Sequence, residues 1–327
     1  MEESMRCERI NCFADGEYDY APACGFQPNL RTYLHGDAEV RPCVLVIPGG
    51  GYRFVSPAEG ELVAKRFYNL GYQTFVGTYT VNLLDREPLK TRPLKDIARM
   101  VRIIRGRAEE FRVDPGKIVI CGFSAGAHLC GTLCVHWQEA EEDNPLWSGV
   151  SCRPDGAILS YPVITSGEFA HRDSFTALLG ARPTAKALKW ASLETQVTEN
   201  TPPVFLWQTA TDELVPVENS YLMAQALKAK GIPFAHHVFP EGQHGLSVAD
   251  EDWANFRLGE HYTLEQAACT AKAVRSGETK AGPAARERVE WFCAMEKADP
   301  EGIPKGKPVP DVAVWPELAD NWMRYHI

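Results

Sequence analysis

The chain has 327 residues, of which 45% are hydrophobic, and its 34 basic and 43 acidic side chains give a formal net charge of −9 at pH 7. A chain of this length buries most of its unfolded surface on folding, and its composition excludes the collagen-like, disordered and membrane-spanning classes. The acidic balance argues against nucleic-acid binding, which requires a basic surface.

The N-terminal segment, MEESMRCERINCFADGE, is acidic and polar and has no apolar h-region, so we expect no secretory signal and a cytoplasmic protein. Several of the ten cysteines lie in apolar stretches such as CVLVIPG and IVICGFS, where a thiol behaves as a small hydrophobe. Because nothing resembles a pair of CxxC motifs, we expect reduced thiols and no metal site.

Strand and helix patterns alternate along the chain without an internal repeat. In chain order, apolar or β-branched runs predict strands at about 29–36, 44–47, 73–80, 117–121, 156–161, 204–208 and 234–239, and helical spacing of apolar residues predicts helices at about 57–70, 94–108, 128–136, 221–230, 286–298 and 315–325. This alternation predicts the α/β class, with a mostly parallel central sheet and helices on both faces.

We predict a single domain over residues 1–327. The segment at about 260–310 departs from the alternation, because it is charged and rich in Gly, Pro and Ala and has one helical pattern. We interpret this segment as a surface insertion or lid. A solvated excursion without a role is the alternative interpretation.

The motif Gly122-Phe123-Ser124-Ala125-Gly126 lies between a predicted buried strand and a predicted helix. A nucleophilic serine on such a sharp turn projects from the carboxyl end of the strand, and small residues are needed on both sides where backbones approach closely. The helix N-terminus favours a developing oxyanion. We therefore interpret Ser124 as a nucleophile, and an ordinary N-cap serine is the alternative.

A second glycine-rich segment, Pro48-Gly49-Gly50-Gly51-Tyr52, follows the strand at 44–47. Acyl transfer places negative charge on a carbonyl oxygen, and backbone N–H groups aimed at that oxygen stabilise it. We expect an oxyanion hole formed by the amides of Gly50, Gly51 or both, together with that of Ala125. A plain glycine-rich turn is the alternative, whereas a phosphate cradle is not expected because no Gly-Lys-Ser/Thr follows.

A serine nucleophile needs a base and a carboxylate that orients the base. The candidate base is His244, in a predicted loop after the strand at 234–239, and the candidate carboxylate is Asp212, just after the strand at 204–208. The chain order Ser124, Asp212, His244 is that of an α/β-hydrolase. The weaker candidates are Glu213, Glu241, Asp155 and Asp173 for the carboxylate, and His35, His128, His136, His171, His236, His237, His261 and His326 for the base.

At these motifs the sequence resembles the α/β-hydrolase esterases, specifically the bacterial branch near acetyl-xylan and feruloyl esterases and the hormone-sensitive-lipase-like group. The matching segments are PGGGY, GFSAGAHL, the block at Asp155–Pro162, TATDELVPVENS, PEGQHGLS and the terminal WPELADNWM. Two residues depart from the family pattern. Pro48 stands where a histidine that supports the oxyanion loop usually begins the motif, and Phe123 stands where the lipase-like group often has Asp.

The resemblance implies two-step hydrolysis of short-chain acyl esters, with acetylated carbohydrates of the xylo-oligosaccharide type as substrates and with neither a metal nor an organic cofactor. The expected partner is a small-molecule ester, not a nucleic acid or a membrane. The sequence does not decide whether the protein forms a homo-oligomer. A prolyl-oligopeptidase-like serine peptidase and a non-catalytic, ligand-binding hydrolase-fold protein remain alternative functions. Aromatic side chains that could line the pocket, each explained equally well by core packing, are Tyr52, Phe54, Tyr79, Tyr161 and Trp207.

Overall fold

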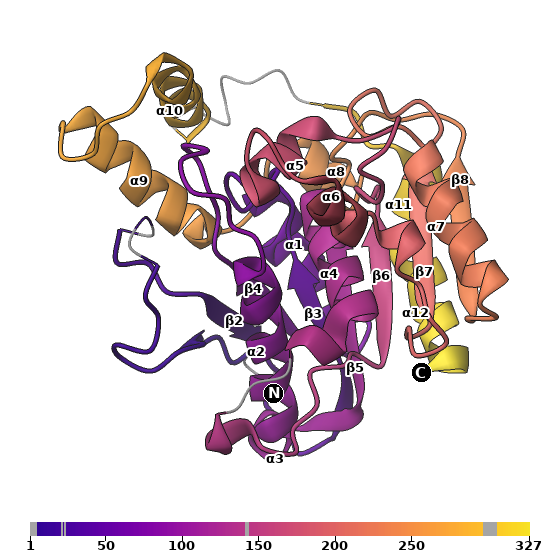
Figure 1. The fold of residues 1–327 in the computed structure, drawn as a ribbon. Coiled ribbons are helices and arrows are strands. Elements are labelled where there is room, and N and C mark those ends of the chain that lie inside the picture. Colours follow the sequence, from indigo (N-terminus) through magenta and orange to yellow (C-terminus); the bar gives the residue numbers. More distant parts are fainter. Residues whose placement is uncertain (1–4, 21, 23, 141–143, 297–305) are drawn as a thin grey trace.

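An eight-stranded sheet with the order β1-β2-β4-β3-β5-β6-β7-β8 forms the centre of the protein in a computed structural model that describes residues 5–20, 22, 24–140, 144–296 and 306–327 (Figure 1). The pairs β1–β2 and β2–β4 are antiparallel, and the other neighbours are parallel. The predicted mostly parallel sheet is therefore confirmed. Its strands are β1 (Arg9–Asn11), β2 (Asn29–Tyr33), β3 (Arg41–Ile47), β4 (Gln73–Thr78), β5 (Val113–Phe123), β6 (Gly156–Ser160), β7 (Val204–Thr209) and β8 (Phe234–Phe239).

Helices cover both faces of this sheet, as the sequence predicts. α2, α4 and α7 pack on one face, and α1 and α12 pack on the other. Within the described ranges, no helix has the length and apolar character needed to cross a membrane. The helices are α1 (Glu61–Asn69), α2 (Arg92–Gly106), α3 (Ala108–Phe111), α4 (Ala125–His136), α5 (Arg172–Leu179), α6 (Ala185–Ala191), α7 (Glu218–Ala229), α8 (Glu251–Ala254), α9 (Glu265–Arg275), α10 (Pro283–Glu296), α11 (Pro310–Ala313) and α12 (Trp315–His326).

The continuous apolar run of β3 has a direct structural cause. Successive side chains of a strand point to opposite faces, so Leu45 and Ile47 pack under α2 and α4 while Val44 and Val46 pack under α1 and α12. All four side chains are fully buried. A strand covered on both faces has no position for a polar side chain, which explains why its sequence shows no alternation.

The ten cysteines all lie in the described part of the chain, and none of them forms a disulfide. Several are packed in the two cores that flank the sheet. Burial raises the pKa of Cys43, Cys121 and Cys130 well above the ordinary thiol value. These side chains are therefore neutral thiols that fill space in the core.

The segment at about 260–310 contains two helices, α9 and α10, where the sequence predicts one. The predicted helix at about 286–298 corresponds to α10, and positions 297 and 298 lie outside the described residues. α9 escapes prediction because its buried positions carry small or polar side chains, which give no periodic pattern of large apolar residues. These positions are Gln266, Ala267, Thr270, Ala271 and Ala273.

The carboxyl ends of β3, β5, β7 and β8 lie at one edge of the sheet, because these strands run parallel. The loops that follow these four strands carry the glycine-rich segment at 48–52, Ser124, Asp212 and His244, respectively. In an open α/β sheet this edge is where ligands bind.

Candidate active site

Ser124 lies on a strained turn between β5 and α4. Its backbone angles are φ 52° and ψ −117°, and a non-glycine residue holds such a conformation only where the surroundings enforce it. The turn leaves no space for larger neighbours, since a Cβ on Gly122 would lie 2.5 Å from the Gly126 carbonyl oxygen and one on Gly126 would lie 2.2 Å from that of Ile47. Small residues are needed here, as the sequence predicts.

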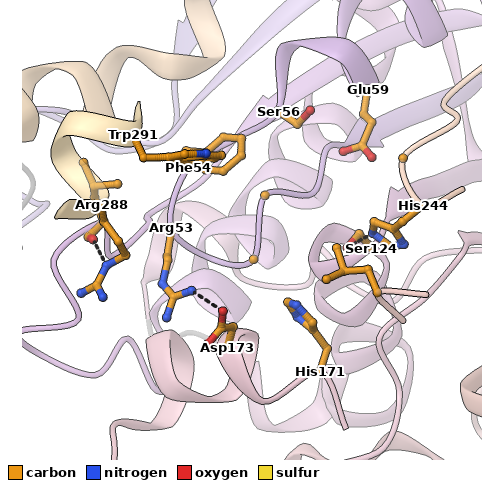
Figure 2. A pocket seen from close by; sticks show the side chains of 15 residues that line it. Arg53, Phe54, Ser56, Glu59, Ser124, His171, Asp173, His244, Arg288 and Trp291 are labelled. Carbon is orange, nitrogen blue, oxygen red and sulfur yellow. Dashed lines mark hydrogen bonds and ion pairs between the residues drawn. The ribbon is translucent and has the colours of Figure 1, made fainter. Parts of the chain in front are cut away.

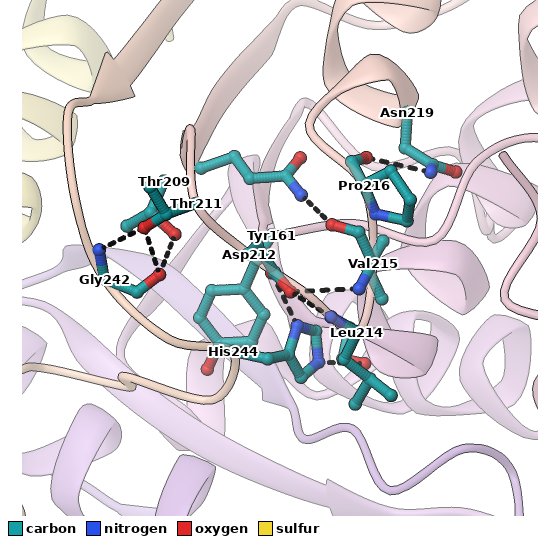
Figure 3. A network of polar contacts seen from close by, with 12 residues as sticks. Tyr161, Thr209, Thr211, Asp212, Leu214, Val215, Pro216, Asn219, Gly242 and His244 are labelled. Atoms are coloured by element: carbon teal, nitrogen blue, oxygen red, sulfur yellow. Dashed lines mark hydrogen bonds and ion pairs between the residues drawn. The ribbon is translucent and has the colours of Figure 1, made fainter.

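Ser124, His244 and Asp212 form one continuous hydrogen-bonded chain. The Ser124 Oγ lies 2.8 Å from His244 Nε2, and His244 Nδ1 lies 2.7 Å from Asp212 Oδ2. The other oxygen of Asp212 accepts the N–H groups of Leu214 at 3.0 Å and Val215 at 2.9 Å (Figure 3). The carboxylate is therefore fixed by the backbone and presents one oxygen to the imidazole.

The two loops that carry Asp212 and His244 are tied to each other. Thr209 Oγ1 donates to the Gly242 carbonyl oxygen at 2.8 Å, and Thr211 Oγ1 donates to the same oxygen at 3.1 Å. The Gly242 N–H in turn donates to Thr211 Oγ1 at 2.9 Å (Figure 3). These bonds hold His244 and Asp212 at a fixed separation.

The glycine-rich segment after β3 has the conformation expected of a loop that exposes its amides. Gly50 and Gly51 have φ values of 115° and 63°, and both line a cavity that also contains Ser124. Within the described part of the chain, neither of their N–H groups has a hydrogen-bond acceptor. The Ala125 N–H is at the first position of α4, where amides have no partner inside the helix.

Glu59 is a buried carboxylate beside this loop that sequence reasoning did not identify. Its Oε2 accepts the Gly49 N–H at 2.7 Å, and its Oε1 accepts the Tyr161 O–H at 2.7 Å. Burial raises the pKa of Glu59, and its hydrogen bonds to Tyr161 and Gly49 act in the opposite direction. The only sequence signal is an acidic residue at a helix start, which is too common to indicate a role.

A cavity of about 610 Å³ opens above Ser124 (Figure 2). Phe54 is the one predicted substrate-binding aromatic that lines it. His171, Arg288 and Trp291 are three of the lining residues that were not predicted to contact substrate. Two of them come from α10, which the sequence places no closer to Ser124 than any other surface helix.

The structure places Tyr52, Tyr161 and Trp207 beneath the cavity, outside its lining. The Tyr52 hydroxyl bonds to His128 Nδ1 at 2.8 Å, and Tyr161 contacts Glu59 as described above. Trp207 is fully buried and stacks on Trp315, with ring centroids 5.2 Å apart. The partners of these three side chains lie inside the protein. We therefore interpret the three rings as core residues that do not contact substrate. Tyr79 is also buried, and its hydroxyl donates to the Pro48 carbonyl oxygen at 2.8 Å.

His128 has the structural role that its position on α4 suggests. Its Nε2 lies 2.8 Å from the Ala191 carbonyl oxygen. Burial lowers its pKa to about 4, so the ring is neutral at pH 7, with Nε2–H donating to Ala191 and Nδ1 accepting from Tyr52. Among the described residues, no group of three or more His, Cys, Asp or Glu side chains is arranged to hold a metal ion.

Comparisons with known proteins show what this chain is similar to. A family model described as BD-FAE matches residues 32–227. Endo-1,4-beta-xylanase B of Butyrivibrio fibrisolvens is 52% identical over 258 residues, which are 79% of this chain and 41% of that protein. An acetylxylan esterase of Xylanibacter ruminicola is 30% identical over 209 residues, 62% of this chain and 40% of the relative. The chain thus spans about two fifths of the length of these two relatives.

A solved structure extends the similarity to almost the whole of another chain. The acetyl ester-xyloside bifunctional hydrolase of Caldicellulosiruptor lactoaceticus superimposes with a TM-score of 0.69 and is 35% identical in sequence. The match covers 83% of this chain and 96% of that chain.

Proposed function

Because this chain belongs to the BD-FAE family of α/β-hydrolase esterases, we propose that it hydrolyses short-chain acyl esters and removes acetyl groups from carbohydrates of the xylo-oligosaccharide type. The names of two similar proteins, an acetylxylan esterase and an acetyl ester-xyloside bifunctional hydrolase, support this substrate class. The observation that carries the proposal is the hydrogen-bonded chain from Ser124 through His244 to Asp212, which opens into the cavity.

The first step forms an acyl-enzyme. Ser124 Oγ attacks the ester carbonyl carbon while His244 Nε2 takes the hydroxyl proton, and Asp212 holds the imidazole in the tautomer that accepts this proton. The amides of Gly50, Gly51 and Ala125 stabilise the negative oxygen of the tetrahedral intermediate. The intermediate then breaks its bond to the alcohol oxygen, which leaves with the proton from His244.

The second step returns the enzyme to its starting state. A water molecule gives a proton to His244 Nε2 and attacks the carbonyl carbon of the acyl-enzyme. The second tetrahedral intermediate occupies the same oxyanion hole. When its bond to Ser124 Oγ breaks, the serine regains its proton from His244 and the carboxylic acid is released.

The proposal extends to the organisation of the chain. Residues 1–327 form a single α/β-hydrolase domain, and the segment at about 260–310 is a surface insertion whose helix α10 borders the cavity. The packing of α9 and α10 against Leu83 and Leu84, with Phe54 at the edge of that cluster, supports this arrangement.

A panel of esters tests the proposed function. We expect acetyl esters and acetylated xylo-oligosaccharides to be hydrolysed faster than butyryl, octanoyl and feruloyl esters, with no comparable cleavage of peptide amides. Ser124→Ala lowers kcat by at least about 10³-fold, whereas Ser148→Ala, on an exposed turn outside the cavity, serves as the matched control. Turnover that survives in Ser124→Ala would contradict the mechanism, and a preference for peptide amides would favour a peptidase.

A further inference from the structure

Trp291 and Phe54, which we call the aromatic platform, form an aromatic surface at one end of the cavity, and Phe54 is partly buried while Trp291 is exposed. Their ring centroids are 5.8 Å apart, and Trp291 is 55% exposed. Among the tryptophans, all of which the structure describes, Trp291 is the only exposed one. When a ligand covers a large apolar ring that faces a cavity, apolar surface is removed from water, which lowers the free energy of the complex.

The aromatic platform lies next to the candidate oxyanion loop. A Cβ on Gly50 would lie 3.2 Å from Phe54 Cδ2 and 2.2 Å from the Phe54 carbonyl oxygen. Figure 2 shows Trp291 and Phe54 at one end of the cavity, with Arg53 below them, and Ser124 and His244 at the other end. Ser124 and the aromatic platform therefore line one and the same cavity.

Two arginines and two aspartates border the aromatic platform and neutralise one another. Arg53 pairs with Asp85 at 2.9 Å and with Asp173 at 3.1 Å. Arg288 pairs with Asp85 at 3.1 Å and donates its Nε–H to the Leu83 carbonyl oxygen at 3.0 Å. With no net charge, this group does not favour an anion or a cation. It offers both donors and acceptors, and the Asp173 side chain is 67% exposed, so it suits a neutral ligand with several hydroxyl groups.

We propose that the aromatic platform binds a neutral pyranose ring on the alcohol side of the ester, with Arg53, Asp173 and Arg288 forming hydrogen bonds to its hydroxyl groups. This inference rests on the proposed esterase function and adds the place where the sugar binds. One face of a pyranose is lined by C–H groups and packs on an aromatic ring, while its hydroxyl groups point outward to the polar side chains. The cavity of about 610 Å³ is in the size range that encloses a ring-sized ligand as well as an acetyl group.

The test compares two acetyl esters that differ in the alcohol. Acetylated xylobiose places a sugar ring on the aromatic platform, and ethyl acetate has no ring. We expect Trp291→Ala to lower the ratio of kcat/KM for acetylated xylobiose to kcat/KM for ethyl acetate by about tenfold. Trp291→Phe keeps an aromatic face and restores most of the ratio. Tyr325→Ala removes an aromatic side chain that is 86% exposed and lies outside the cavity, so it leaves the ratio unchanged.

Two results in this assay would overturn the subsite. A ratio that is the same in Trp291→Ala and in the wild type shows that the sugar does not contact Trp291. A loss confined to methyl ferulate, tested alongside, shows that an aromatic acyl group occupies the platform instead of the sugar.

Binding of unacetylated xylobiose separates this inference from the proposed function. A titration followed by tryptophan fluorescence is expected to change the signal of the wild type and to leave that of Trp291→Ala constant. This readout decides the subsite even if the wild type hydrolyses none of the esters, in which case the proposed function fails. Equal titrations of the two proteins would refute the subsite.

Discussion

Glu59 connects the glycine-rich loop to the loop that carries His244. It accepts hydrogen bonds from Gly49 and Tyr161, and the Tyr161 oxygen accepts the Ser247 N–H at 3.1 Å. The resemblance to the α/β-hydrolase esterases leads us to expect a histidine that supports this loop at the position of Pro48. Here the Glu59 carboxylate holds the loop from below, so we treat Glu59 as a positioning residue.

Replacing Glu59 with alanine tests this role. Glu59→Ala leaves the Gly49 N–H without its acceptor, and the loop amides lose their fixed direction toward the proposed oxyanion position. We expect kcat to fall by about 10- to 100-fold, with a smaller change in KM, because a misplaced oxyanion donor acts mainly in the transition state. Ester hydrolysis at saturating substrate measures this effect.

The conservative variant separates geometry from charge. Glu59→Gln keeps an acceptor for the Gly49 N–H, and its amide can donate to the Tyr161 oxygen, so most of kcat should return. If Glu59→Gln is as slow as Glu59→Ala, the charge of Glu59 is required and the positioning account is wrong. If both variants keep full kcat, Glu59 has no role in the reaction.

The sequence predicts the residues of the hydrogen-bonded chain because each occupies a recognisable local motif. Ser124 lies in a Gly-x-Ser-x-Gly turn, and Asp212 and His244 lie in the loops that follow two predicted strands. Trp291 and Glu59 belong to no such motif. Their proximity to Ser124 depends on how α10 and the Pro57–Glu59 turn pack, which periodicity in the sequence does not encode.

At the scale of elements, α9 and α10 form a two-helix unit with its own small hydrophobic core. Their buried side chains cluster with Leu83 and Leu84, separately from the two cores that flank the sheet. Phe292 is fully buried in this cluster and lies 6.3 Å from Phe54 between ring centroids. This two-helix unit can therefore unfold locally while the sheet stays folded.

Phe292→Ala tests this independence. Truncating a buried phenylalanine costs about 3–5 kcal/mol, and we expect the loss to appear as local opening of α9 and α10. Hydrogen exchange should accelerate across residues 265–296 and stay slow in β3, β5 and β6. The neighbouring variant Trp291→Ala removes an exposed ring and serves as the control, with protection of the helices retained. Uniform acceleration throughout the sheet would contradict a separate core.

The prediction of elements from sequence succeeds where burial requires large apolar residues. The central strands and α2 follow this rule, since both faces of the sheet are covered. α9 is not predicted because its buried positions are mostly alanines and polar residues instead of large apolar ones. Close packing of small residues stabilises a helix without producing the pattern that identifies one.

At the scale of the whole molecule, a buried carboxyl on α2 links stability to pH. Asp96 accepts hydrogen bonds from the Thr80 N–H at 2.9 Å and from the Thr80 hydroxyl at 2.5 Å. Burial raises the pKa of Asp96 from 3.8 to about 7. Between these two values the folded protein holds a proton that the unfolded chain has released, so the contribution of Asp96 to stability falls as pH rises from about 4 to about 7.

Asp96→Asn removes this contribution. The three-unit difference in pKa corresponds to roughly 4 kcal/mol, so the free energy of unfolding of the variant, relative to the wild type, should rise by up to that amount between pH 4 and pH 8. Urea denaturation across this range measures the difference. Buried histidines such as His128 act with the opposite sign but are present in both proteins. Parallel curves for the two proteins would contradict the assignment, and Asp15→Asn, on an exposed turn, is the control.

The most direct test of the central claim is to locate the nucleophile covalently. Paraoxon phosphorylates a serine that is activated by a histidine and faces an oxyanion hole. We predict that loss of esterase activity follows the attachment of one diethylphosphoryl group per chain, that mass spectrometry places this group on Ser124, and that His244→Ala slows its attachment by several orders of magnitude. A fully phosphorylated Ser124 with undiminished ester turnover, or inactivation by a group on another residue, would contradict the account.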